Sequence, residues 1–399
     1  MFRLLYDVFI ALYGIAIRLS PSEKARKWRE GRIDLFESIE KQDLNNCTWF
    51  HCASVGEFEQ ARPLIELLRT ESDSKILLTF FSPSGYEVHK DYASVDYVCY
   101  LPIDKRTQML RMIDLVKPSK LILVKYELWY HLMKVGVESG VEMYLVAARF
   151  RPDQAYFKWW ASPFLRVLKK FNGIYVQDSA SYNLLKKCGF QNVQQSGDPR
   201  FDRVLELKKQ DLEFDRIEDS SRKVLVAGST WEKDEKILFE WLEGYNDKWC
   251  LILVPHEWHA KDQERLKAHL KNRLAFFSEG GKLNGKTDVL VVDAKGILSR
   301  LYRVGDLNYV GGGFGAGIHN ILEACVYGNP VVFGPNHRKF GEAAEVLSLG
   351  FGQTVMNSND LDSAIQELSS HDWSEDIQNY FGEKGQVSEG LFQSIFNHQ

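Results

Sequence analysis

The sequence has no two cysteines at the Cys-x-x-Cys spacing that zinc sites and redox motifs use. Its six cysteines are scattered over 399 residues, mostly inside apolar runs, so we expect the reduced, buried thiols of a cytosolic protein. A basic excess is also missing, since the formal net charge is −4, which argues against nucleic acid as a partner. Neither a Gly-x-Gly-x-x-Gly fingerprint nor a Gly-Lys-Ser/Thr P-loop occurs, and no Asp-x-Asp metal motif stands in a plausible place.

A long apolar run is missing too, because the uninterrupted run 8–17 is shorter than the roughly 20 residues that span a bilayer. Residues 2–19 are nevertheless mostly apolar and include Asp7, and no small-residue cleavage site follows them. The next segment, 20–32, is rich in Lys and Arg. This pattern predicts that residues 1–32 form an interfacial helix and basic segment that anchor the protein on an anionic cytoplasmic leaflet. The alternative is a helix docked on the protein's own core.

The rest of the chain alternates short β-rich runs with helical stretches, which is typical of parallel sheets with crossover helices. We expect an α/β fold with two Rossmann-like, doubly wound domains at 33–205 and 223–375, joined by a charged linker at 206–222. A helical segment at 376–399 is predicted to pack on the first domain. Ligands bind such sheets at the carboxyl ends of the strands, so we expect an interdomain cleft. The predicted strands are CTWFHCAS, KILLTFFS, DYVCYLP, KLILVKYE, EMYLVAAR, GIYVQD, KVLVAGST, WCLILVPH, DVLVVDAK, LNYVGG, PVVFGP and GQTVM.

Three polar groups of the first domain are candidates for chemistry. The turn Ser54-Val-Gly-Glu57 follows a predicted strand and opens a helix. Its carboxylate is either an acid that suits the helix dipole or a base placed to take a proton. Glu127 also follows a strand, with a surface ion pair as the alternative. Arg200 lies near the domain junction, where a guanidinium could hold a carboxylate or a phosphate.

In the second domain, Gly228, Ser229 and Thr230 follow a strand and precede a helix, whose N–H groups suit a phosphate. The alternative is an ordinary helix cap with an acidic first turn. His256 follows another strand and belongs either to a nucleotide-facing loop or to a solvated one. Its His-Glu-x-His spacing does not fit a zinc protease.

The glycine-rich loop 311–317 is the strongest stretch of the second domain. We expect a helix to begin after it, at Ile318 or His319, with Asn320 in its first turn. The glycines of this loop would let its backbone approach a phosphate closely. Glu323 could accept hydrogen bonds from ribose hydroxyls. A purely structural glycine turn is the alternative.

Together these stretches resemble the 3-deoxy-D-manno-octulosonic acid (Kdo) transferases of lipopolysaccharide assembly, which are GT-B-type glycosyltransferases. The resemblance runs from the N-terminus to about residue 355. It rests on SVGE at 54–57, SPSG at 82–85, YLPID at 100–104, YELW at 126–129, AR at 148–149, GDPRFD at 197–202, GSTWEKDE at 228–235, LVPH at 253–256 and HNILEACVYGNPVVFGP at 319–335.

The resemblance implies that Kdo moves from CMP-Kdo to a sugar hydroxyl of a lipid A precursor (lipid IVA) by inversion, without a metal or a separate cofactor. It makes Glu57 the general base, adds Glu127 and Arg200 to the catalytic candidates, and places the protein at the cytoplasmic face of the inner membrane. The aromatic run 149–160 is a second candidate for lipid contact, with helix packing as the alternative. The positions that would bind the cytidine nucleotide are Pro255, His256, Lys295, Gly296, Ile297, Asn320, Ile321, Leu322 and Glu323.

The chain departs from the family pattern at several of these positions. Lys125 and Tyr126 stand where the family commonly has Glu-Thr, Arg200 replaces a lysine, Pro255-His256-Glu257 replaces Pro-Arg-His, and Trp231 replaces a histidine. These changes leave the CMP contacts open. The alternatives are another GT-B transferase, a UDP-sugar epimerase, or a catalytically inactive membrane-associated binding protein.

Overall fold

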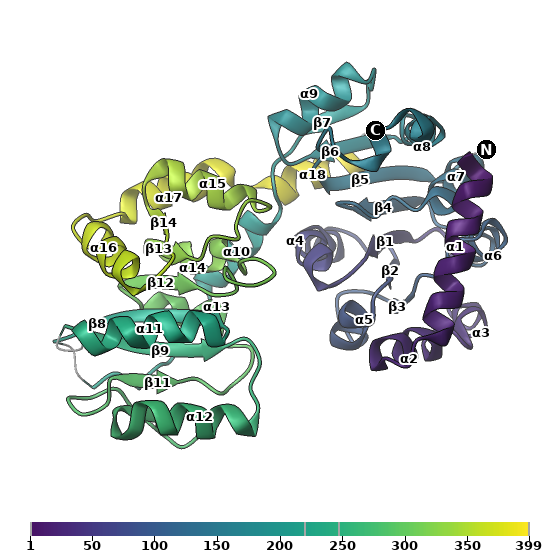
Figure 1. Cartoon of the computed structure of the whole chain (residues 1–399). Helices are drawn as coiled ribbons and strands as arrows, with labels where there is room; N and C mark the ends of the chain where they lie inside the picture. Colours follow the sequence, from purple (N-terminus) through teal and green to yellow (C-terminus); the bar gives the residue numbers. More distant parts are fainter. Residues whose placement is uncertain (1, 219–220, 246–247, 398–399) are drawn as a thin grey trace. The chain divides into compact units, whose positions relative to one another are not determined.

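The computed structural model describes residues 2–218, 221–245 and 248–397. The chain folds into two compact units, each built on one seven-stranded parallel sheet (Figure 1). Unit 1 comprises Met1–Arg203 and Gln386–Gln399, and unit 2 comprises Val204–Gly385. The expected α/β architecture with two doubly wound domains is confirmed.

The sheet of unit 1 has the strand order β3-β2-β1-β4-β5-β6-β7. The chain builds outward from β1 in one direction and then from β4 in the other, so the topological switch point lies between β1 and β4. Most of its strand residues are buried, as expected for a parallel sheet covered on both faces. The strands are β1 (Thr48–Cys52), β2 (Ile76–Phe80), β3 (Tyr97–Tyr100), β4 (Lys120–Val124), β5 (Glu142–Ala148), β6 (Gly173–Val176) and β7 (Val193–Gln195).

Helices surround this sheet, and the pattern of α4 shows why they form. Phe58, Ala61, Leu64, Ile65 and Leu68 recur at helical spacing and are all buried against the sheet. The helices of unit 1 are α1 (Phe2–Leu19), α2 (Glu23–Glu30), α3 (Leu35–Glu40), α4 (Val55–Glu71), α5 (Pro83–His89), α6 (Arg106–Val116), α7 (Tyr130–Glu138), α8 (Ser162–Leu168), α9 (Ser179–Lys187), α10 (Arg200–Lys209) and α18 (Val387–Phe396), with 3₁₀ turns η1 (Ala155–Phe157) and η2 (Trp159–Ala161).

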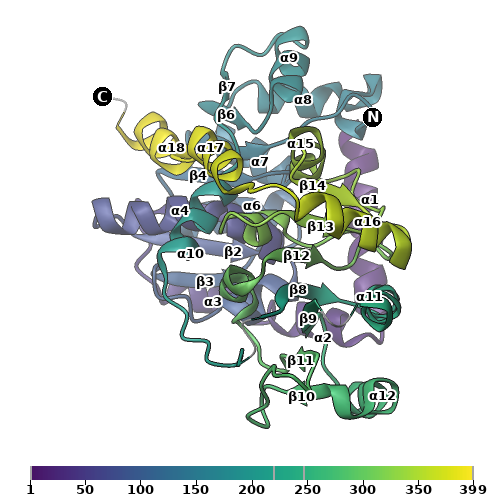
Figure 2. The same ribbon diagram turned by 90° about the vertical axis from the view of Figure 1, so that its left-hand side faces the viewer.

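Unit 2 repeats this architecture with the strand order β10-β11-β9-β8-β12-β13-β14, and Figure 2 shows these strands in sequence from β10 at the bottom to β14 at the top. Its switch point lies between β8 and β12. The strands are β8 (Lys223–Thr230), β9 (Trp249–Pro255), β10 (Leu274–Phe276), β11 (Val289–Val291), β12 (Leu307–Val310), β13 (Val331–Phe333) and β14 (Gly352–Thr354). The helices are α11 (Glu232–Tyr245), α12 (Ala260–Leu270), α13 (Leu298–Leu301), α14 (Ile321–Cys325), α15 (Gly341–Leu349), α16 (Ser358–Leu368) and α17 (Ser374–Lys384), with 3₁₀ turns η3 (Lys271–Arg273) and η4 (Tyr302–Val304).

The predicted strands are all present. Strands β7 and β10 were not predicted, because two residues of β7 are exposed glutamines and β10 has no β-branched residue. The helix after the glycine loop begins later than expected. Asn320 caps it, with its side-chain Oδ1 accepting from the N–H of Leu322, so α14 starts at Ile321 and not at Ile318 or His319. The unit boundary falls inside α10, and the predicted segment 376–399 divides, with α17 in unit 2 and α18 in unit 1.

The N-terminal helix α1 lies along the flank of unit 1 (Figure 1). Two polar contacts tie it there. The hydroxyl of Tyr6 donates to buried Asp104 at 2.6 Å, and Asp7 meets Nε2 of buried His131 at 2.5 Å. Helix α1 is therefore docked on unit 1, and its contact with a membrane stays a prediction. Among the described residues, no helix is both long enough and apolar enough to cross a membrane.

The face of α1 that points away from unit 1 is apolar and exposed. Part of the basic segment after it has a structural role, which the sequence did not show. Arg29 donates to the carbonyl of Ile17 at 2.7 Å and so closes the end of α1. Arg32 donates to the carbonyls of Leu101 and Phe81. The guanidiniums of Arg29 and Arg32 are therefore hydrogen-bonded to backbone carbonyls of the protein itself.

Candidate functional site

Glu57 lies in the first turn of α4, directly after β1. The hydroxyl of Ser54, the residue before the helix, donates to Oε2 of Glu57 at 2.5 Å and makes no backbone cap. This differs from a capping box, in which the serine would bond the backbone N–H three residues on. Nζ of Lys125 lies 4.0 Å from Oε1 of Glu57. The carboxylate therefore has a hydroxyl on one oxygen and a cation near the other.

Glu127 follows β4, the strand beside β1, so the two glutamates arise at adjacent strand ends of the switch point. The indole Nε1 of Trp129 donates to Oε2 of Glu127 at 2.8 Å, and Nε2 of His51 lies 3.5 Å from the same oxygen. The side chain of Glu127 is only 12% exposed, so the expected alternative of a surface ion pair does not describe it. Burial raises the pKa of the Cys52 thiol, and the charges of Glu57 and Glu127 raise it further.

The backbone at these strand ends is strained. Lys125 after β4 and Ala147 within β5 both have a positive φ, at 62° and 53°, although neither is a glycine. Such conformations cost of order 1–3 kcal/mol each and cluster at functional sites. The N–H of Lys125 donates to the carbonyl of Val146 at 2.9 Å, which holds the turn that presents Lys125 and Glu127.

Arg200 is placed differently from the two glutamates. It begins α10 and holds Asp198 through Nε at 2.9 Å and Nη2 at 2.6 Å. The structure therefore brings Glu57 and Glu127 together at adjacent strand ends, whereas Arg200 pairs with Asp198. A second arginine at a strand end, Arg149, pairs with Asp178 at 3.0 Å.

In unit 2, the turn that contains Gly228, Ser229 and Thr230 carries a register shift between β8 and β9, and Ser229 has φ 54°. The N–H of Trp231 donates to the Asp234 carboxylate at 2.9 Å. The same carboxylate accepts from the glycine loop N–H of Gly312 at 3.1 Å. Helix α11 thus has the acidic first turn that the alternative includes, and phosphate binding at this turn stays a prediction.

A ladder of three aromatic rings lies at the strand ends of unit 2. The rings of Trp231 and His256 are 4.9 Å apart, and those of His256 and His319 are 4.3 Å apart. Burial and the neighbouring His256 lower the pKa of His319 to about 4, so this imidazole is neutral at physiological pH. Neither Trp231 nor His319 was predicted as a site residue, although both lie in stretches that carry the family resemblance.

The remaining residues predicted to bind the nucleotide differ in how exposed they are. Nδ2 of Asn320 donates to Oε1 of Glu323 at 2.8 Å. Ile321 and Leu322 are fully buried, so their side chains do not reach a ligand. In the turn after β11, Lys295 and Gly296 are exposed and Ile297 is half-buried. The same turn leads into Leu298 and Tyr302, which lie so close to Gly228 that a Cβ there would fall 2.6 and 2.1 Å from them.

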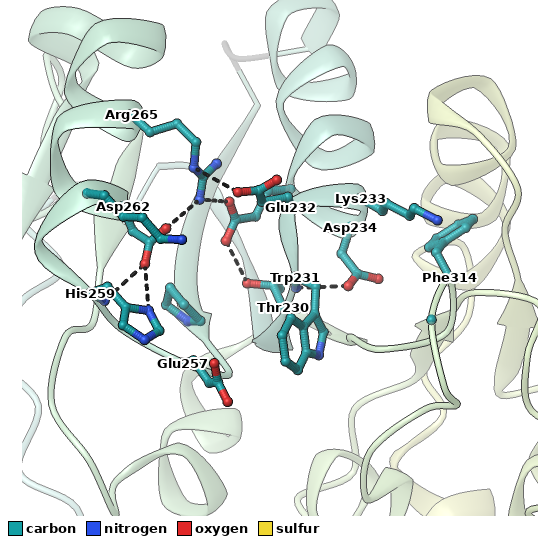
Figure 3. Close-up of a pocket in the computed structure, with 14 residues that line it drawn as sticks. Thr230, Trp231, Glu232, Lys233, Asp234, Glu257, His259, Asp262, Arg265 and Phe314 are labelled. Atoms are coloured by element: carbon teal, nitrogen blue, oxygen red, sulfur yellow. Dashed lines mark hydrogen bonds and ion pairs between the residues drawn. The ribbon is translucent and has the colours of Figure 1, made fainter. Parts of the chain in front are cut away.

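A cavity of about 350 Å³ opens in unit 2 between α11 and α12 (Figure 3). Arg265 crosses it and pairs with buried Glu235 at 2.6 Å, while burial raises the pKa of Glu235. Five carboxylates face three cations, so the charge of this cavity disfavours a phosphate. Of the predicted nucleotide residues, Thr230 and Pro255 line it. The full lining is Thr230, Trp231, Glu232, Lys233, Asp234, Glu235, Pro255, Glu257, His259, Lys261, Asp262, Arg265, Phe314 and Gly315.

In the part of the chain that the structure describes, no group of three or more His, Cys, Asp or Glu side chains could hold a metal ion. The expectation of a metal-independent reaction stays a prediction.

Comparison with known proteins gives three findings. The family model described as 3-Deoxy-D-manno-octulosonic-acid transferase (kdotransferase) matches residues 26–203. The 3-deoxy-D-manno-octulosonic acid transferase of Aquifex aeolicus is 33% identical over 346 residues, which cover 83% of this chain and 89% of the relative. A bifunctional glycosyltransferase/methyltransferase of Fusobacterium nucleatum is 28% identical over 410 residues, which cover 97% of this chain. The chain spans 62% of that longer protein.

Among solved structures, the UDP-GlcNAc 2-epimerase from Neisseria meningitidis bound to UDP-GlcNAc is similar with a TM-score of 0.59 and 14% sequence identity. The similarity covers 88% of this chain and 99% of the epimerase. At this identity it shows the fold alone.

Proposed function

The chain belongs to the 3-deoxy-D-manno-octulosonic acid (Kdo) transferase family and is a glycosyltransferase, and we propose that it transfers Kdo from CMP-Kdo to a sugar hydroxyl of a lipid A precursor. The observation that carries the proposal is the convergence of Glu57 and Glu127 at the switch point of unit 1. Doubly wound sheets bind their ligands at this place. Lys125 adds a cation there, 4.0 Å from Glu57.

In the proposed reaction Glu57 is the general base. Its carboxylate accepts the proton of the acceptor hydroxyl while that oxygen forms a bond to the anomeric carbon of Kdo. The bond from the anomeric carbon to the phosphate oxygen breaks, its electron pair stays on that oxygen, and CMP leaves. Attack opposite the leaving group inverts the anomeric centre. The hydroxyl of Ser54 keeps Oε2 of Glu57 occupied, so Oε1 is the oxygen that takes the proton.

We assign the cytidine nucleotide to the carboxyl ends of β8, β9 and β12 in unit 2. His256 and the capping residue Asn320 lie at these ends. Glu323, which accepts from Asn320, is the acceptor for ribose hydroxyls in this assignment. The acid-rich cavity between α11 and α12 shares Thr230 and Pro255 with these strand ends, but its five carboxylates would repel a phosphate.

The experiment is an assay of the full chain with CMP-Kdo and the tetra-acylated lipid A precursor, with the product weighed by mass spectrometry. Glu57→Gln should lower kcat by about 10²- to 10⁴-fold, the usual contribution of a general base. The matched control is Glu71→Gln, because Glu71 is an exposed acid at the other end of the same helix. Unreduced turnover by Glu57→Gln would refute its role as base. Absence of any Kdo product from the unmodified chain, or tighter binding of UDP than of CMP, would refute the donor assignment.

We also propose that the outward face of α1 rests in the cytoplasmic leaflet of the inner membrane, where a lipid acceptor would lie. The ring of Trp160 lies 6.5 Å from that of Phe2, so η2 and the start of α1 share one surface. Trp159 is 80% exposed beside it. Among the described residues, Arg18 and Lys24 are exposed basic groups near α1 that have no ion-pair partner and could meet anionic lipid. The exposed apolar side chains of α1 are Leu4, Leu5, Val8, Phe9, Leu12, Ile15 and Leu19.

A further inference from the structure

His51 lies in β1 beneath the two glutamates of unit 1, and its side chain is fully buried. One ring nitrogen, Nδ1, is 2.9 Å from the hydroxyl of Thr79 and 3.2 Å from the carbonyl of Thr79. The other, Nε2, faces Oε2 of Glu127 at 3.5 Å and has no hydrogen-bond partner within the stricter geometric limits. A buried polar nitrogen aimed at a carboxylate calls for a physical explanation.

The surrounding contacts decide where the ring protons lie. The Thr79 hydroxyl accepts from the indole of Trp49 at 2.8 Å and has one proton to give. The hydroxyl lies closer to Nδ1, at 2.9 Å, than to the carbonyl of Phe50, at 3.3 Å, so its proton is assigned to Nδ1. The neutral ring then carries its proton on Nε2, which faces the Glu127 carboxylate.

We propose that His51 is a positioning residue for sugar transfer, whose Nε2–H draws Oε2 of Glu127 inward and leaves Oε1 as the oxygen that meets the ligand. The indole of Trp129 donates to the same Oε2 at 2.8 Å, so both donors hold one side of the carboxylate. The proposal rests on the proposed function, because Glu127 matters only if the switch point of unit 1 is where the reaction occurs.

Other titratable groups face this pair from neighbouring elements. Cys52, next to His51 on β1, is a thiol whose pKa is raised by burial and by both glutamates. Glu57 and Lys125 approach from the start of α4 and the end of β4. Tyr156 approaches from η1, since burial and then the charge of Glu127 raise its pKa. The charged groups that surround Glu127 are therefore one cation, Lys125, and one further carboxylate, Glu57.

The test compares two substitutions in the full chain. In His51→Gln the side-chain amide reaches the place of Nε2 and keeps a donor for Glu127. In His51→Asn the shorter amide reaches the place of Nδ1, keeps the contact with Thr79 and loses the donor. His51→Asn should lower kcat by about 100-fold, as expected when a catalytic group shifts by about 1 Å. His51→Gln should stay within about tenfold of the unmodified chain, the worth of one ordinary hydrogen bond.

The pH profile separates positioning from packing. Loss of a donor to a carboxylate disfavours its ionised form, so the acid limb of kcat/KM should move to higher pH in His51→Asn and stay in place in His51→Gln. Equal losses in the two variants, with an unmoved acid limb and unchanged melting temperatures, would overturn the proposal and leave the proposed function standing.

A measurement without substrate tests the proposal separately. In protein labelled with ¹⁵N-histidine, the His51 ring is identified by its absence from the spectrum of His51→Gln. Its Nε2 should show a bonded proton near neutral pH, and its resonance should move in Glu127→Gln. An unprotonated Nε2 would overturn the proposal even if the enzyme transfers Kdo. A protonated Nε2 in a chain that transfers no Kdo would locate the failure in the proposed function.

Discussion

The apolar outer face of α1 gives a prediction whose size follows from the structure. Leu5, Phe9 and Leu12 are 59%, 60% and 60% exposed, so each has most of its apolar surface left to bury. Full burial of such a side chain is worth about 1.5–3 kcal/mol, so roughly 1–2 kcal/mol remains at each position. Replacing all three by glutamine, which forms helices well, should cost about 3–6 kcal/mol of membrane binding. This corresponds to at least a 100-fold weaker partition into vesicles.

The assay is sedimentation with vesicles of phosphatidylethanolamine and phosphatidylglycerol. The matched control replaces three other exposed apolar residues by glutamine, namely Val88, Leu349 and Met356, which are 66%, 50% and 58% exposed. We expect the control to bind as the unmodified chain does. The melting temperature of the α1 variant should not fall, because its three side chains already face solvent. Equal vesicle binding by the α1 variant and the control variant would refute the reasoning.

Two further predictions concern stability and are measured by urea unfolding. Tyr6→Phe removes the 2.6 Å hydrogen bond to the buried carboxyl of Asp104 and should lower the free energy of unfolding by about 1.5–3 kcal/mol. Tyr13→Phe on the same helix should change little, because its hydroxyl has no hydrogen bond among the described residues; equal effects would contradict the role of this contact. Gly313→Ala would put a Cβ 2.5 Å from the backbone of Gly334 and should destabilise unit 2 by about 1–3 kcal/mol. Gly315→Ala meets nothing closer than 3.6 Å and should be tolerated, so a comparable loss there would refute the packing argument.

The sheets could be predicted because parallel strands are nearly continuous apolar runs. The strands β7 and β10 were not predicted because neither is a run of buried apolar residues: two residues of β7 are exposed, and two of β10 are only partly buried. The start of α14 was wrong by two or three residues, since a glycine loop does not reveal which side chain will cap the helix. In this chain the cap is Asn320.

The candidate site could be predicted in part. The place of Glu57 follows from local sequence, because a strand-to-helix turn at a sheet end is a local feature. The contacts that decide its surroundings join distant residues, such as His51 with Glu127 and Asp7 with His131. The count of basic residues in 1–32 was also insufficient to predict lipid contacts, because the guanidinium of Arg29 is engaged by backbone carbonyls at the end of α1. Such pairings arise only once the sheet order is set.

The return of α18 to unit 1 also bears on the order in which the protein is made. Leu391 and Ile395 of α18 join the same apolar cluster as Phe58 of α4, the helix that begins beside Glu57. The N–H of Ser388 donates to Asp202, which fastens the start of α18 to the same unit. As the chain leaves the ribosome, unit 2 is synthesised in full before this cover for α4 exists. The helix that carries the candidate base is thus translated before unit 2 and fully packed only after it.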